Sequence, residues 1–278
     1  MPRSGFSNSM MMTFPPFGGM VRKLIYANLT VYFGLLLLGW VAPGVAGGIL
    51  RLGALTPAMV THGALWQILT YSFLHVGILS ILFNMLSLWF VGAYMEAAYG
   101  TRWITELYSV SVIGAALTTI AVSYTGIFHL TPTATTFGPM GGIFGLLAAF
   151  GTRMGEQQFL LFPLPISIRA KYLVLIYILI AVASLMQGPG GFIYLAYLGG
   201  ALFGYLYAKQ APRRGFAFAA SERIYGTRNA YYRWKRKRAA RKFEVYMRQH
   251  KHDTNPGAAG RYTDPDKDRD PNDRRWMH

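Results

Sequence analysis

Gly138-Pro139-Met140-Gly141-Gly142-Ile143-Phe144-Gly145 is the stretch that decides the fold, with Gly199-Gly200-Ala201-Leu202-Phe203-Gly204 as its partner. Both runs lie in apolar sequence and place glycines four residues apart, at Gly141 and Gly145 and at Gly200 and Gly204. In lipid, helices associate where small residues on one face let their backbones approach. The pattern therefore predicts two helices that pack together at the centre of a membrane bundle.

The composition indicates a membrane protein with a basic tail. The 278 residues are 53% hydrophobic and 14% charged, with a mean hydropathy of +0.29; soluble domains carry about 25% charged residues. From Lys209 onward there are 19 Lys and Arg and 8 Asp and Glu residues, so +11 of the net charge of +16 lies there. The absence of cysteine excludes disulfides and thiolate chemistry. The six histidines are scattered, so we predict no metal site and no cofactor.

Hydropathy predicts an all-α, six-helix transmembrane bundle. A helix needs about 20 residues to cross the bilayer, so the fourth and fifth spans are short, and the fourth should begin below the membrane surface. We expect a flexible arm at 1–20, a membrane domain at 21–208 and a basic, partly disordered tail at 209–278. The candidate spans are Leu24–Val41, Val76–Tyr94, Trp103–Tyr124, Gly138–Gly151, Tyr172–Met186 and Phe192–Ala208.

The positions of Lys and Arg predict the topology. Basic residues concentrate in cytoplasmic connections, and here every second connection is basic whereas the others are nearly free of charge. Both termini are therefore expected in the cytoplasm, and we expect an integral protein of a prokaryotic plasma membrane. Glu96, near a cytoplasmic helix end, is expected to pair with Arg102 or to cap a loop. The basic connections contain Arg22 and Lys23, Arg102, then Arg153, Arg169 and Lys171, and finally the tail.

The first external loop, residues 42–71, is too long for a simple turn. It is apolar and contains Trp66, and tryptophan rings settle at the membrane interface. We therefore predict that this loop is structured and lies in the interface.

Five blocks of sequence, in order over residues 24–208, make the chain similar to the rhomboid family of intramembrane serine proteases. A lone glycine pair would be weak support, but five blocks in order are specific. They are Trp66-Gln67-Ile68-Leu69-Thr70-Tyr71-Ser72-Phe73-Leu74-His75, Leu82-Phe83-Asn84-Met85-Leu86-Ser87-Leu88-Trp89, Tyr94-Met95-Glu96 with Tyr99-Gly100, Gly138 to Gly145, and Ala196-Tyr197-Leu198-Gly199-Gly200.

This resemblance implies a catalytic Ser–His pair, and both positions are changed here. The serine position holds Met140, whose thioether cannot form an acyl-enzyme. The histidine position holds Tyr197, a poor base at neutral pH because a tyrosine pKa is about 10. Three remnants of an oxyanion site are carried over: Asn84 keeps the asparagine, Ser80 stands where relatives carry a histidine, and His75 matches another frequent histidine.

The resemblance together with the missing pair predicts a pseudoprotease, because loss of either member removes nearly the whole effect of such a pair. Inactive relatives, including derlins, bind or route membrane proteins, so we expect this chain to bind the transmembrane segments of client proteins. One alternative is an active protease that uses Ser72, Ser80, Thr135 or Thr136. The other is a channel or transporter, which should carry charges inside its spans.

The tail is expected to bind a polyanion on the cytoplasmic side. Anionic headgroups attract each Lys or Arg near the surface by about 1 kcal/mol, so lipid is the first candidate. Basic residues interleaved with aromatic ones also suit RNA or an acidic partner. The residues concerned are Arg233, Lys235, Arg236, Lys237, Arg238, Arg241 and Lys242.

Overall fold

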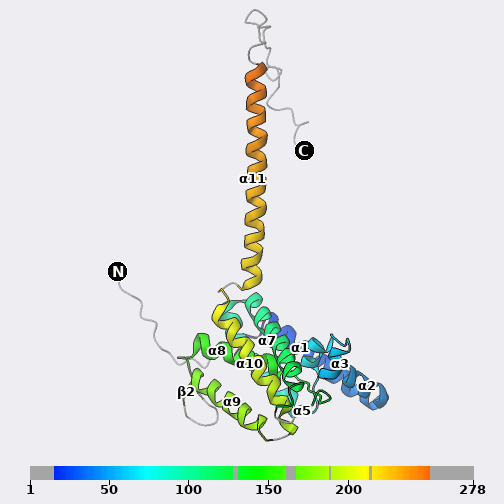
Figure 1. Ribbon diagram of the computed structural model, residues 1–278. Coiled ribbons are helices and arrows are strands. Elements are labelled where there is room, and N and C mark those ends of the chain that lie inside the picture. Colours follow the sequence, from blue (N-terminus) through cyan, green and yellow to red (C-terminus); the bar gives the residue numbers. More distant parts are fainter. Residues whose placement is uncertain (1–15, 128–130, 161–166, 188, 213–214, 251–278) are drawn as a thin grey trace, which may run out of the picture. The chain divides into compact units, whose positions relative to one another are not determined.

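The computed structural model describes residues 16–127, 131–160, 167–187, 189–212 and 215–250 (Figure 1). Residues 1–15 of the expected arm at 1–20, and the end of the tail from 251, lie outside these ranges. The last two residues of that arm, Gly19 and Met20, belong to helix α1. The helical elements are α1 Gly19–Val41, α2 Pro43–Gly53, α3 Pro57–Thr61, α4 Gln67–Thr70, η1 Tyr71–Phe73, α5 Ile78–Ser87, η2 Leu88–Gly92, α6 Ala93–Tyr99, α7 Thr101–Ser123, α8 Met140–Met154, α9 Ala170–Leu185, η4 Pro189–Gly191, α10 Phe192–Gln210 and α11 Phe216–His250.

Each of the six predicted spans coincides with helical structure. Three stretches are long and apolar enough to cross a membrane, namely Gly19–Val41, Ile78–Tyr99 and Thr101–Ser123. The second of these is continuous across α5, the π-helical turn η2 and α6. Met140–Met154 and Ala170–Leu185 are apolar but shorter, as expected for the fourth and fifth spans.

Two predicted helix starts are shifted by glycines. Gly77 has a φ of +95° and Gly138 a φ of +106°, a region that residues other than glycine rarely adopt. Helix α5 therefore begins after Gly77, and α8 begins at Met140 rather than at Gly138. The consequence for the site is that Met140 is the first residue of its helix.

The regular structure of the described residues is helical, as the all-α prediction expects, apart from a short hairpin and one isolated bridge that the sequence did not predict. Strand β1, Gln158–Leu160, pairs antiparallel with β2, Ser167–Arg169. Beside the hairpin, the exposed carboxylate of Glu156 bonds Lys171 at 2.5 Å and Arg169 at 3.1 Å. The hydrogen bond and charge of Lys171 lower the pKa of Glu156. These contacts tie the end of α8 to the start of α9.

Helices α7, α8 and α10 form the centre of the membrane domain. Residues 141–150 of α8 are all buried. A Cβ added to Gly200 would overlap the carbonyl of Gly141, and one added to Gly204 would overlap the backbone of Gly145. The two glycine pairs thus lie at the crossing of α8 and α10, where a side chain would force the backbones apart.

The segment between α1 and α5 is folded by side-chain bonds to the end of α2. The indole Nε1 of Trp66 donates to the carbonyl of Leu52 at 2.9 Å, and Nε2 of Gln67 donates to the same oxygen at 3.1 Å. Oε1 of Gln67 accepts the backbone N–H of Thr56 at 3.0 Å. Because Gln67 is fully buried, its amide fixes α4 against the α2–α3 connection.

Glu96 caps a helix rather than a loop. Its carboxylate accepts the backbone N–H groups of Met20 at 2.7 Å and Val21 at 3.0 Å, which are unpaired donors in the first turn of α1. The sequence had suggested a pair with Arg102 or a loop cap. Among the described residues, Glu96 instead bonds the start of α1. The negative charge also complements the helix dipole.

Glu106, on α7, makes a similar connection that the sequence analysis missed. One carboxylate oxygen accepts the hydroxyl of Tyr207 at 2.8 Å and the backbone N–H of Phe216 at 2.7 Å. Glu106 therefore joins α7 to α10 and holds the first residue of α11.

The chain divides into two compact units, Met1–Ala219 and Ala220–His278. Helix α11 continues across this boundary as one helix (Figure 1). The seven predicted tail residues, Arg233, Lys235, Arg236, Lys237, Arg238, Arg241 and Lys242, all lie on α11 and are exposed.

Candidate functional site at the start of helix α8

The start of α8 is positioned by the extended segment that precedes it. Thr136 exchanges two backbone hydrogen bonds of 2.9 Å with Leu55, and the N–H of Gly138 donates to the carbonyl of Tyr71 at 2.8 Å. The hydroxyl of Tyr71 in turn donates to the carbonyl of Val112 on α7 at 2.8 Å. Met140 follows directly, half-buried against the core. The position of Met140 is thus set by hydrogen bonds that join the preceding segment to several other parts of the fold.

Tyr197 lies on α10 within a group of aromatic side chains. Its ring centroid is 5.0 Å from that of Phe144 and 5.3 Å from that of Tyr194. Phe144 also meets Tyr177 of α9 at 6.3 Å. These contacts are within the range of favourable aromatic pairs. Four rings, here called the aromatic cluster, therefore join α8, α9 and α10 at the position where the resemblance implies a histidine.

The alternative nucleophiles do not meet a base in the described structure. The hydroxyl of Ser72 donates to the carbonyl of Leu69 at 2.8 Å, and that of Thr135 bonds Thr56 at 3.2 Å. The two histidines with described side chains, His62 and His75, each bond a backbone carbonyl through Nδ1. Ser80 is exposed and Thr136 buried. Among the described side chains, no serine or threonine hydroxyl bonds a histidine nitrogen.

The three oxyanion remnants lie on or just before α5. His75 and Asn84 are buried, at 5% and 4% exposure, whereas Ser80 is exposed one turn before Asn84. Nε2 of His75 is buried and bonds no described residue, and burial lowers the pKa of His75. Helix α5 contacts α8. Within the described ranges, however, no hydrogen bond joins these remnants to Met140 or Tyr197.

A cavity of about 480 Å³ lies beside the segment that leads into α8. Phe137, three residues before Met140, forms part of its wall, and the side chains are mostly apolar with one charged group, Arg51. Its size and apolar lining are typical of ligand sites, and it can hold an apolar side chain beside an acidic one. The wall consists of Leu50, Arg51, Ala54, Thr56, Met59, Leu74, Val76, Thr135 and Phe137.

Sequence reasoning found Met140 and Tyr197 but not their surroundings. Tyr194 is one helical turn before Tyr197, and Phe144 is one turn after Met140, so their spacing carried a usable signal. The sequence gave no signal for the contact of Tyr177 or for the cavity, because these depend on how α9 and α2 pack against the rest of the domain.

The chain is similar in sequence to known proteins over its membrane part. Residues 62–213 match the Rhomboid domain family. The chain is 36% identical to RHOMBOID-like protein 1 of Arabidopsis thaliana over 36% of this chain and 24% of that protein. It is 34% identical to Rhomboid protease GluP of Bacillus subtilis (strain 168), over 36% of this chain and 18% of that protein. It is 30% identical to Rhomboid protein 1, mitochondrial, of Saccharomyces cerevisiae, over 49% of this chain and 37% of that protein. The chain thus spans less than half the length of these relatives.

Proposed function

Because the chain belongs to the rhomboid family, we propose that it is a non-cleaving member that binds other membrane proteins. The proposal is supported by the residues Met140 and Tyr197, which stand at the two positions where the resemblance to the family implies the reacting serine and histidine. A thioether has no proton to give up and a phenol is a weak base at neutral pH. Tyr197 also packs in the aromatic cluster, which supports a structural role for its ring.

The client in this proposal is a transmembrane protein whose segment outside the bilayer enters the cavity. An apolar residue of the client fills the space beside Leu74 and Phe137, and an acidic residue pairs with Arg51. In this proposal the six predicted spans cross the membrane, including the two short ones, and both termini lie in the cytoplasm of a prokaryotic cell. The distribution of Lys and Arg supports this orientation.

The proposal is tested by photo-crosslinking in the native membrane. A photoreactive amino acid replaces Phe137 in the cavity or, as a control, Val182, which is exposed on α9. We expect position 137, and not 182, to capture defined membrane proteins at their full length, with less capture after Arg51→Gln. Equal capture from both positions would contradict a client site, and captured fragments ending at one peptide bond would indicate cleavage.

A further inference from the structure

Helix α11 carries a charge that the proposed function does not use. Between Tyr225 and Tyr246 it contains eight Lys and Arg residues and one acidic residue, Glu244. Every side chain described in this stretch is exposed. A helix that is polar all round has no apolar stripe with which to pack against a core. This surface is therefore available for a partner.

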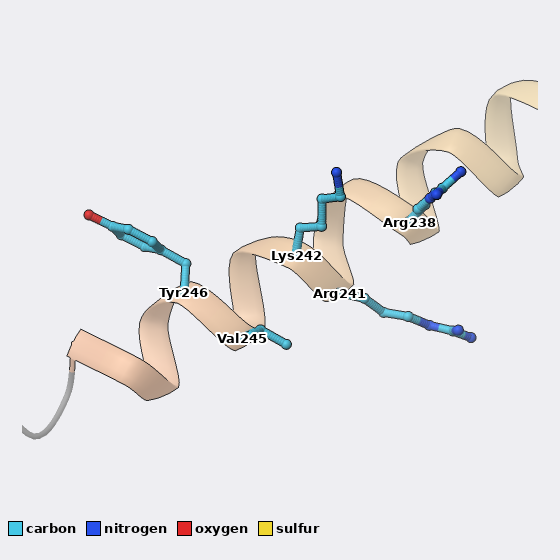
Figure 2. A pocket seen from close by; sticks show the side chains of 5 residues that line it. All are labelled: Arg238, Arg241, Lys242, Val245 and Tyr246. Carbon is cyan, nitrogen blue, oxygen red and sulfur yellow. The ribbon is translucent and has the colours of Figure 1, made fainter.

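The basic residues lie on opposite faces of the helix. At 3.6 residues per turn, Arg233, Lys237 and Arg241 share one face, which we call face A. Arg228, Lys235 and Lys242 share a second, face B, about 160° away. Figure 2 shows the side chains of Arg241 and Lys242 leaving the helix in different directions, around a shallow hollow that Arg238, Val245 and Tyr246 also line.

The aromatic residues are also distributed around the helix. Trp234 and Phe243 are nine residues apart, which places them about 180° apart, and both are more than half exposed, at 54% and 64%. The guanidinium of Arg238 lies 5.3 Å from the ring centroid of Trp234, a cation–π contact. Exposed aromatic rings thus lie on both sides of the helix, and one of them, Trp234, contacts a cation.

We propose that α11 binds RNA on the cytoplasmic side. A flat bilayer can meet only one face of a helix about 10–12 Å wide, and charges on the far face are screened beyond about 8 Å at physiological salt. An RNA strand can place phosphates along both faces, and its unpaired bases stack on aromatic and guanidinium planes. The charge on both faces therefore favours RNA over a lipid surface.

The test uses the full chain in nanodiscs of phosphatidylcholine, which carry no net charge. The probe is a fluorescent 24-nucleotide single-stranded RNA of mixed sequence, and its binding is measured by anisotropy at several salt concentrations. Two variants are compared, R233Q/K237Q/R241Q for face A and R228Q/K235Q/K242Q for face B. Glutamine is a good helix former, and circular dichroism checks that helicity is kept.

We expect both variants to weaken RNA binding about tenfold or more and by similar factors. Each should also reduce the slope of log K against log salt by about 2, since a single strand contributes about 0.7 per phosphate contact. The matched control, Glu244→Gln, removes a negative charge and should not weaken binding. The proposal is overturned if the unmodified protein binds no RNA at 100 mM salt, or if only one face matters. If only one of the two variants weakens RNA binding, and the same variant alone weakens binding to phosphatidylglycerol vesicles, α11 would instead be assigned to anionic lipid.

Discussion

His75 is the buried titratable residue closest in sequence to α5, and its Nε2 bonds no described residue. Because burial lowers its pKa in the folded protein, the unfolded chain binds the proton more readily. Stability is therefore complete above the ordinary histidine pKa of about 6.5 and is lost as the pH falls below it towards the folded pKa. We expect the melting temperature to fall between pH 7.5 and 5. The His75→Gln variant, which cannot take up this proton, should show a smaller fall over the same range; an equal fall would exclude His75 as the cause.

The glycine at position 200 has a specific energetic role. A Cβ there would overlap the carbonyl of Gly141, a backbone atom that cannot rotate away. We expect Gly200→Ala to destabilise the protein by about 1–3 kcal/mol, as overpacking does, and to lower the melting temperature in detergent. Gly34→Ala is the matched control, since it is also mid-helix but has open space around it. The control should be neutral or slightly stabilising; equal effects would contradict the close crossing of α8 and α10.

At the scale of elements, Glu96 holds the start of α1. Replacing it with alanine leaves the N–H groups of Met20 and Val21 without their carboxylate acceptor. We expect a cost of about 0.5–2 kcal/mol, typical of a lost N-cap. Hydrogen exchange should become faster at these two amides, whereas Glu244→Ala, an exposed change on α11, should leave them unchanged. Unchanged protection in the Glu96 variant would show that the cap is not needed.

The helices were predictable from the sequence to different extents. The apolar runs and the i, i+4 glycines were sufficient to locate α1, α7, α8 and α10. A helix that spans the lipid needs a minimum number of apolar residues, and a close helix crossing needs small residues at the contact. The starts of α5 and α8 were less accurate because positive-φ glycines end the preceding loops. The carboxylate caps could not be predicted, since Glu96 and Glu106 bond residues far away in the chain. The β1–β2 hairpin was also missed, although its strands are close in the sequence.

For the whole molecule, the sequence offered a motif on which to predict site residues, but it gave no information on how the surrounding helices pack. The prediction of Met140 and Tyr197 as site residues rests on the motif, whereas the aromatic cluster depends on α9, and the cavity on α2 and α3. We propose that the rhomboid fold can be kept without the catalytic chemistry. If the backbone around Met140 remains suited to catalysis, the Met140→Ser/Tyr197→His double variant supplies both missing groups and should gain proteolytic activity.

We propose that the protein cleaves no peptide bond because Met140 and Tyr197 replace the nucleophile and the base. The direct measurement is a proteolysis assay in proteoliposomes with a single-span substrate, comparing the purified protein with the Met140→Ser/Tyr197→His variant. We predict no cleavage above background by the unmodified protein, whether or not the variant cuts. Cleavage by the unmodified protein that disappears on replacing one of its own serines or threonines would contradict the account.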